Sequence, residues 1–418
     1  MTLKADTSED AGTAAEQRDA LVEELVATGR ITSAAVERAF RTVPRHLFMP
    51  AGTPLEAAYA VDRSVVVKRG PDGTALSSVS AAYIQARMIE QAGLGPGMSV
   101  LEIGAGGLNA ALLAEVVGPA GRVVSVDIDP EVVDRAHRLL AATGYADRVT
   151  VLRADAEYPV PELGGRVDAV VVTVGAWEVA PAWLEQLAEG GRLVVPLRLN
   201  GVTRTIGFAR DGDHLASTSA VVAGFVPMQG AGAHDGRIVV LTDGQGCQVT
   251  LTFDTEPPGK VGRLEGVLTT AQATVWSGVT IGNQVSFADL HLWFACFLPG
   301  FCRLAVDDGT DLAAGHRRWF PFGTVRGGSV AYLVVRPAVD GAGAEFGACA
   351  YGPHGERVAT GVVEQIRAWD RQARHAAAPT FAYWPAGSSR PPADANTAVL
   401  AKKRGEVTVS WPTTLCPP

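Results

Sequence analysis

Cysteine is scarce in this chain, with five residues in 418: Cys247, Cys296, Cys302, Cys349 and Cys416. Their number is odd and they lack the close spacing of metal ligands, so we predict neither a disulfide framework nor a metal site. Cys296 and Cys302 lie in an apolar stretch, which favours buried free thiols. Because free thiols are typical of a reducing compartment, we expect a cytoplasmic protein.

Basic clusters and long apolar runs are missing as well. The formal net charge is -8, and Lys402-Lys403-Arg404 is a short basic run, which argues against a nucleic-acid binder. The longest apolar stretch, residues 290–306, is interrupted by polar residues, proline and glycine, so we expect no membrane span. The first twenty residues lack a basic start followed by an apolar core, so a secretory signal is not expected.

The chain does contain ample core material, with 47% hydrophobic residues, and its length allows about two or three domains. We expect a disordered tail, a helical region with a substrate loop, a central core and a C-terminal domain. Their boundaries are residues 1–16, 17–92, 93–235 and 236–418.

Strand-like and helix-like segments alternate through the central core, which predicts a Rossmann-like, doubly wound parallel α/β sheet. The expected strands are residues 99–103, 122–126, 149–153, 167–174 and 192–197, and the expected helices are 110–117, 131–143 and 181–188. Residues 70–80 are expected to form a polar loop. After residue 236, short β-like segments with helices near 287–294 and 359–374 predict an α+β domain; the first helix fits a buried face better than a peptide-docking groove.

A glycine cluster predicts the position of a ligand site in the core. The run Val100-Leu-Glu-Ile-Gly-Ala-Gly-Gly107 ends the first strand, and the second strand ends at Asp127. Glycines allow close backbone approach to a ligand, and an acid at this strand end can accept both hydroxyls of a ribose. Asp155 follows the third strand, where a side chain can reach an adenine amino group. Asn109 stands where a dinucleotide fingerprint has its third glycine, which argues against a dehydrogenase.

A glycine turn after the first strand, followed by Asp127 after the second and Asp155 after the third, resembles the pattern of S-adenosylmethionine-dependent methyltransferases. Four further runs resemble the protein-L-isoaspartate O-methyltransferases over about residues 17–232. They are Arg41-Thr-Val-Pro-Arg-His-Leu-Phe48, Ser78-Val79-Ser80, Ala86-Arg87-Met88 and Phe225-Val-Pro-Met228.

The resemblance implies S-adenosylmethionine as the cofactor and a carboxylate as the methyl acceptor. Ser80, with Ser78 as a second candidate, is expected to hold that carboxylate; otherwise these serines only satisfy loop backbone groups. The residues implied to bind the cofactor are Val79, Glu102, Gly104, Ala105, Gly106, Gly107, Asn109, Asp127, Ile128, Asp155, Ala156 and Thr173.

Three features depart from the repair enzymes: a glycine loop one residue shorter, Ala82 in place of a proline, and the appended C-terminal domain. A long form of this kind is similar to the FxLD-system, lanthipeptide- and RiPP-associated aspartate O-methyltransferases. That resemblance implies a precursor or modified peptide as partner, whose aspartate is methylated and then converted to aspartimide or isoaspartate.

Two alternatives stay open at this point. One is ordinary isoaspartate repair with an accessory domain, and the other is a degenerate core that serves as a peptide-binding module. Trp177, after the fourth strand, fits a peptide cleft and core packing equally well. The sequence specifies neither the peptide nor the oligomeric state.

Overall fold

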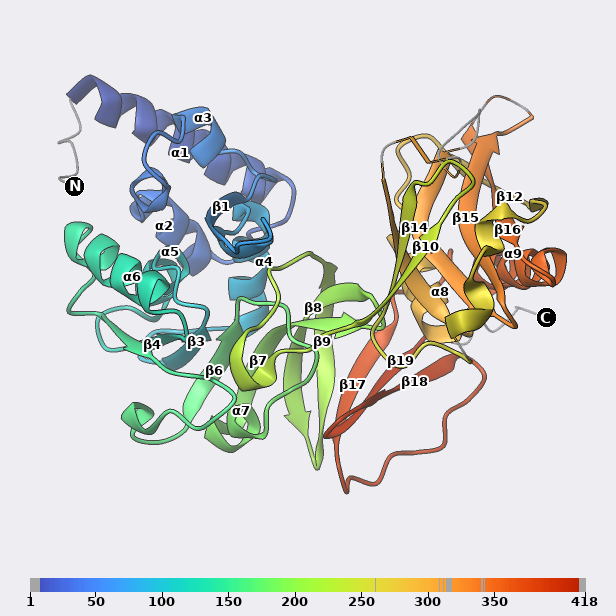
Figure 1. Ribbon diagram of the computed structural model, residues 1–418. Coiled ribbons are helices and arrows are strands. Elements are labelled where there is room, and N and C mark those ends of the chain that lie inside the picture. Colours follow the sequence, from blue (N-terminus) through green and yellow to red (C-terminus); the bar gives the residue numbers. More distant parts are fainter. Residues whose placement is uncertain are drawn as a thin grey trace. The chain divides into compact units, whose positions relative to one another are not determined.

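The computed structural model describes residues 8–259, 261–307, 309, 310, 312, 318–339, 341 and 343–412. The chain divides into two compact units, whose elements are coloured along the sequence in Figure 1. The first unit comprises residues 1–197 and 203–234, and the second comprises residues 198–202 and 235–418.

The first unit begins with helices α1 (Ser8–Ala27), α2 (Ala34–Thr42) and α3 (Leu55–Ala58). The prediction of a disordered tail is wrong for residues 8–16, because α1 already starts at Ser8 and Ala14 is buried. Alanine carries little hydrophobic signal, so the sequence does not reveal that the buried face of α1 extends this far. Residues 1–7 lie outside the described part of the chain.

A β-hairpin occupies most of the segment expected to be a polar loop. Strands β1 (Val65–Arg69) and β2 (Ala75–Val79) pair antiparallel, with Val66 opposite Ser78. The turn closes with the Gly70 N–H donating to the Thr74 carbonyl at 2.8 Å. Helix α4 (Ala82–Ala92) follows directly, so Ser80 lies in the short link between a strand and a helix.

The sheet of the first unit has the predicted doubly wound pattern. Its strands are β3 (Ser99–Ile103), β4 (Arg122–Asp127), β5 (Val149–Arg153), β6 (Val167–Val172), β7 (Leu187–Leu199), β8 (Val202–Asp211) and β9 (His214–Val222). The spatial order is β9-β8-β7-β6-β3-β4-β5, and the pairs from β7 to β5 are parallel. The chain order reverses between β3 and β6, which places a ligand crevice at the carboxyl ends of these strands.

Helices α5 (Leu108–Val117), α6 (Pro130–Ala142) and α7 (Pro181–Gln186) connect the parallel strands. Helix α2 packs against α5, and one continuous core joins α1, α2, α4, α5 and α6 to the sheet. Strand β6 is buried along almost its whole length, as a strand covered on both faces should be. The same core therefore holds the N-terminal helices and the strand ends in one rigid unit.

The second unit is built mainly from antiparallel strands. Its larger sheet has the order β10-β11-β13-β14-β15-β16-β12. The bounds are β10 Arg237–Thr242, β11 Gln248–Phe253, β12 Ala273–Gly282, β13 Phe301–Val306, β14 Arg318–Arg326, β15 Ser329–Pro337 and β16 Gly343–Tyr351. Strands β17 (Thr380–Pro385) and β18 (Thr397–Lys402) both pair with β19 (Gly405–Ser410).

Helices α8 (Ala288–Phe297) and α9 (Gly355–Gln372) complete this α+β unit. The side chains of Leu290, Trp293 and Phe294 are buried, so α8 presents a core face, as predicted. Among the described residues no helix is long and apolar enough to cross a membrane.

Candidate active site

The glycine turn after β3 adopts a conformation that few other residues tolerate. Gly104 has φ +104° and Gly107, which begins α5, has φ +86°. A Cβ on Gly104 would lie 2.2 Å from the Thr173 hydroxyl, whereas a Cβ on Gly106 would meet nothing within 4 Å. The turn therefore packs tightly against Thr173 at Gly104. At Gly106 it is open, and a ligand can approach the backbone there.

Asp127 lies at the end of β4 beside this turn. Its carboxylate accepts the Ala105 N–H at 3.1 Å and the Asp129 N–H at 2.9 Å. Burial raises the pKa of Asp127, although these backbone hydrogen bonds act in the opposite direction. Each oxygen keeps a lone pair for a further donor such as a ribose hydroxyl.

Asp155 follows β5 and contacts a segment distant in sequence. Its carboxylate accepts the Glu157 N–H at 3.0 Å and the Ala231 N–H at 2.8 Å. A Cβ on Gly230 would lie 2.5 Å from the Asp155 Oδ2, so glycine is needed for this close approach. Residues 230 and 231 thus lie against the Asp155 carboxylate.

Two adjoining cavities, each of about 50 Å³, run along the carboxyl edge of the sheet and share Leu76, Gly104, Asp127 and Val174. Most of the residues predicted to bind the cofactor line them. These are Val79, Gly104, Gly106, Asn109, Asp127 and Thr173 in the first cavity, and Ile128, Asp155 and Ala156 in the second. The glycine turn, Asp127 and Asp155 therefore follow one another along the carboxyl edge of the sheet.

Glu102, Ala105 and Gly107 do not line either cavity. Glu102 is fully buried in β3, where its carboxylate accepts the Asn109 Nδ2–H at 2.8 Å and the Ser125 hydroxyl. Burial raises the pKa of Glu102 to about 7, with Asn109 and Ser125 opposing and Asp127 reinforcing the rise. In the shortened loop Asn109 is thus anchored to the strand behind it and also borders the first cavity.

This buried carboxyl leads to a pH-dependent prediction. Between pH 4.5 and about 7, Glu102 keeps its proton in the native state, whereas the unfolded chain has lost it. The contribution of Glu102 to the free energy of unfolding therefore falls as the pH rises through this range. The size of this loss is about 3 kcal/mol. Glu102→Gln has no proton to lose, so its free energy of unfolding should rise by about 3 kcal/mol relative to wild type between pH 4.5 and 8.

The measurement is urea unfolding at the two pH values, with protection of the β3 amides from hydrogen exchange as the readout for this unit. Glu185, exposed on α7, provides the control, because Glu185→Gln changes a group that is in water in both states. A difference between Glu102→Gln and wild type that does not depend on pH would show that Glu102 ionises normally.

A wider groove of about 510 Å³ adjoins the first cavity. Ser78, Ser80 and Val226 line both, so the two serines lie where the groove meets the cavity. The hairpin and residues 223–227 form the sides of the groove.

Arg45 fixes the segment between β2 and α4 that contains Ser80, which we call the serine link. The sequence analysis did not identify Arg45 as a site residue. The guanidinium is buried and donates to the Ser80 carbonyl at 2.7 Å, the Ala58 carbonyl at 2.7 Å and the Gln85 Oε1 at 2.5 Å. Burial lowers the pKa of Arg45 to about 10, and the side chain remains charged at neutral pH. Because its hydrogen bonds all go to neutral oxygens, it adds positive potential beside the place where a carboxylate would bind.

The sequence pattern gave little indication of the other residues that line the first cavity. The first cavity also includes Leu76, Gln85, Met88 and Val226. Gln85 is buried on the inward face of α4. A polar residue on the apolar face of a helix was the sequence feature that could have indicated a functional position there. Trp177 does not line the cavities or the groove; its ring stacks on His234 with centroids 4.0 Å apart.

In the described part of the chain, no group of three or more His, Cys, Asp or Glu could hold a metal ion. Cys247, Cys296, Cys302 and Cys349 are thiols rather than disulfides, and Cys302 and Cys349 are buried. Cys416 lies outside the described residues. The predicted buried thiol is thus confirmed for Cys302, whereas Cys296 is only partly buried.

Comparison with known proteins agrees with this site. The sequence profile of the protein-L-isoaspartate(D-aspartate) O-methyltransferase family matches residues 16–232. A protein-L-isoaspartate O-methyltransferase of Hyperthermus butylicus is 39% identical over 190 residues, which is 44% of this chain and 75% of that protein. The corresponding protein of Korarchaeum cryptofilum is 34% identical over 220 residues, which is 50% of this chain and 96% of the relative.

Two solved structures carry related descriptions. One, a protein-L-isoaspartate O-methyltransferase, is 27% identical, covers 60% of this chain and 91% of its own, and has a TM-score of 0.47. The other, a putative protein-L-isoaspartate O-methyltransferase of Plasmodium falciparum in complex with S-adenosyl-L-homocysteine, is 16% identical, covers 51% and 98%, and has a TM-score of 0.43.

The family profile spans more than half of the chain and includes the glycine turn, both acids and the serine link. The chain therefore belongs to the protein-L-isoaspartate(D-aspartate) O-methyltransferase family, and it is an S-adenosylmethionine-dependent protein carboxyl O-methyltransferase.

Proposed function

We propose that this enzyme methylates an aspartate side chain in a ribosomally synthesised peptide of the RiPP or lanthipeptide type. The observation that carries the proposal is the second unit. Residues 235–418 lie outside the family match, although the first half of the chain already covers 96% of the relative from Korarchaeum cryptofilum. An added unit of this size suits the recognition of one particular peptide better than the recognition of scattered damage.

S-adenosylmethionine, when bound, supplies a methyl group on a positively charged sulfur. An aspartate carboxylate is already ionised at neutral pH, since its ordinary pKa is about 3.9, so the protein need not supply a strong base. A carboxylate oxygen forms the bond to the methyl carbon, and the electron pair of the broken carbon–sulfur bond remains on sulfur. The work of the protein is therefore to position the carboxylate and exclude water.

The residues proposed for this work lie at the junction of the cavities and the groove. Ser80, with Ser78 beside it, donates to the substrate carboxylate, while Asp127 and Asp155 hold the ribose and the adenine. The methyl ester then reacts within the peptide. The next backbone nitrogen attacks the ester carbonyl, methanol leaves with the amide proton, and the aspartimide either persists or hydrolyses to isoaspartate.

Repair of isoaspartate in damaged proteins is the second candidate, because the relatives that match the first unit are named protein-L-isoaspartate O-methyltransferases. A peptide-binding module without activity has no such observation in its favour. For either enzymatic function we propose a cytoplasmic location, in keeping with the free thiols of the described residues.

One assay distinguishes the two enzymatic candidates. The protein is incubated with S-adenosylmethionine and, in separate reactions, with the peptide encoded beside its gene and with a generic isoaspartyl peptide. We expect mass spectrometry to show methylation of the encoded peptide, followed by loss of methanol. Methylation of the isoaspartyl peptide alone would establish repair instead.

A further inference from the structure

The larger sheet of the second unit ends in two edge strands, β12 and β10, which differ in how they are protected. An exposed sheet edge offers unpaired N–H and C=O groups to any extended chain, and proteins normally block such edges with bulges, charges or covering elements. The comparison of these two edges indicates which one is available for binding.

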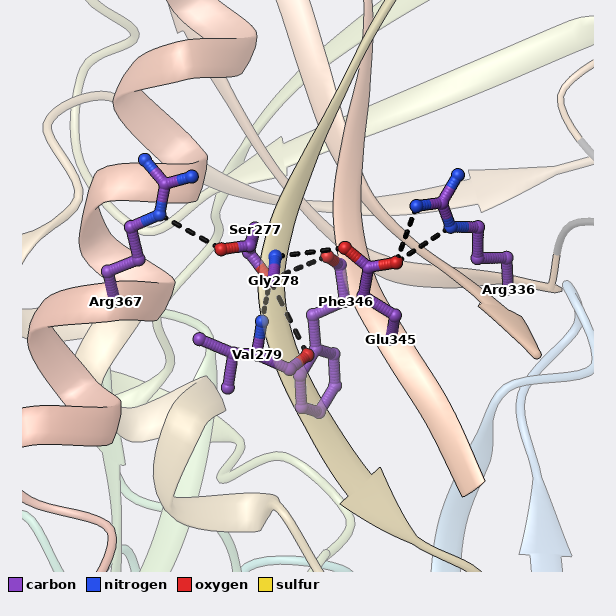
Figure 2. A network of polar contacts seen from close by, with 7 residues as sticks. All are labelled: Ser277, Gly278, Val279, Arg336, Glu345, Phe346 and Arg367. Atoms are coloured by element: carbon purple, nitrogen blue, oxygen red, sulfur yellow. Dashed lines mark hydrogen bonds and ion pairs between the residues drawn. The ribbon is translucent and has the colours of Figure 1, made fainter. Parts of the chain in front are cut away.

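The β12 edge is interrupted by a bulge, whose polar contacts Figure 2 shows. The register of β12 with β16 shifts between Trp276 and Thr280. Within the bulge the Gly278 N–H donates to Glu345 at 2.9 Å, and the Arg367 Nε–H of α9 donates to the Ser277 carbonyl at 2.9 Å. Helix α9 also packs along this strand. Two backbone groups of the bulge, the Gly278 N–H and the Ser277 carbonyl, are therefore already engaged.

Among the described residues, the β10 edge has neither a bulge nor a covering α-helix; its one charged residue is Arg237 at the start of the strand, and residues 267–269 contact the strand. Its residues from Arg237 to Thr242 pair with β11 one for one, without a bulge and without a proline. Ile238 and Val240 are 65% and 53% exposed, whereas Val239 and Leu241 are buried. An apolar strand is thus left open at the edge of the sheet.

The free backbone groups belong to the same exposed residues. The Asp243 N–H donates to the Cys247 carbonyl at 3.0 Å, which fixes the hydrogen-bonded positions of this antiparallel pair. By alternation Val239 and Leu241 bond to β11, so Ile238, Val240 and Thr242 direct their N–H and C=O groups outward. Backbone donors, acceptors and apolar side chains are therefore presented together.

We propose that β10 is a docking edge at which an extended segment of the peptide substrate adds as a further strand. Strand addition takes its affinity from main-chain hydrogen bonds and its selectivity from alternate side chains. The added segment should carry apolar, preferably β-branched, residues beside Ile238 and Val240. The choice of a peptide as occupant rests on the proposed function.

A second copy of the chain is the less suitable occupant. A stable protein dimer buries more than about 1,000 Å², and pairing two six-residue strands supplies only a fraction of that area. For a peptide, by contrast, one strand is a sufficient interface.

The test uses the full chain without S-adenosylmethionine and a fluorescein-labelled peptide of alternating valine and threonine residues, with fluorescence anisotropy as the readout. Val240→Pro removes an outward N–H and no bond to β11, so it should weaken binding by about tenfold or more. Val240→Thr keeps the N–H and the branched shape and should bind within about threefold of wild type. Ile238→Lys, which alters no backbone group, should weaken binding like the proline variant.

Equal binding by wild type, Val240→Pro and Ile238→Lys would overturn the proposal, and so would absence of binding to wild type. A wild-type dimer in sedimentation that Val240→Pro converts to a monomer would assign the edge to a second copy. Methylation of a short isoaspartyl peptide is measured in parallel and should be unchanged in all three variants. Because binding is measured without methyl transfer, failure of the proposed reaction would leave this result intact.

Discussion

Replacing Asp127 with alanine is expected to raise the dissociation constant for S-adenosylmethionine by about 100-fold. The carboxylate lies at the end of β4 and lines both cavities, where it is the acid closest to the glycine turn. A hydrogen bond to an ionised group contributes about 1.5–3 kcal/mol, and about 3 kcal/mol corresponds to this change. Isothermal titration calorimetry on the apo protein measures it directly.

Control variants distinguish the loss of a contact with the cofactor from a disruption of the glycine turn, since either would weaken binding. Asp127 also accepts the Ala105 and Asp129 N–H groups, so alanine leaves both donors without this acceptor. Asp127→Asn retains one acceptor oxygen, so it can keep one of these two bonds, and it should weaken cofactor binding by about tenfold. Asp134→Ala, at an exposed position of α6, should leave the dissociation constant unchanged. A change of less than threefold in Asp127→Ala would remove Asp127 from the cofactor site.

The parallel sheet and its crevice could be predicted because their signals are local. Strand β6 is apolar except for Asp168, Asp127 ends another largely apolar run, and the glycines lie between strand and helix. Once the strands are parallel, the positions of Asp127, Asp155 and Gly104 at one edge follow from geometry alone. That step requires no knowledge of side-chain packing.

The parts that escaped prediction depend on contacts between distant residues. The hairpin β1–β2 has no apolar alternation, since Ser77 and Ser78 are partly buried polar residues in a strand. The hydrogen bond from the Ala231 N–H to Asp155 joins segments that are 76 residues apart, and no pattern in either segment predicts this contact. The resemblance implied that Glu102 contacts the cofactor, but its side chain is fully buried in β3, a strand buried on both faces, and lines neither cavity.

Arg45 is the residue for which we expect the largest effect on turnover. Its guanidinium donates to three acceptors at once, and a lysine ammonium lacks the planar fork needed to reach all three. In Arg45→Lys the Ser80 carbonyl loses its fixed position, so kcat should fall by about 100-fold because the acceptor carboxylate is misaligned. The dissociation constant for S-adenosylmethionine should change by less than about threefold, since the cofactor acids are untouched.

A double-mutant cycle tests whether Arg45 acts through the serine link. Ser80→Ala alone should lower kcat by about tenfold, the loss of one hydrogen bond to a charged group. If both residues serve one positioned carboxylate, the combined loss in Arg45→Lys with Ser80→Ala should be clearly smaller than the product of the single losses. Arg41→Lys, on the surface of α2 and paired with Glu37, is the matched control and should retain full turnover.

Stability and turnover must be measured together for this residue. Arg45→Met would leave three buried acceptors without a donor, each at a cost of about 1–3 kcal/mol, so its free energy of unfolding should fall by several kcal/mol. Arg45→Lys retains a donor and the charge, and should lose less stability than Arg45→Met while losing most of the turnover. Full turnover in Arg45→Lys, or independent effects of Arg45 and Ser80, would reduce Arg45 to a structural residue of the core.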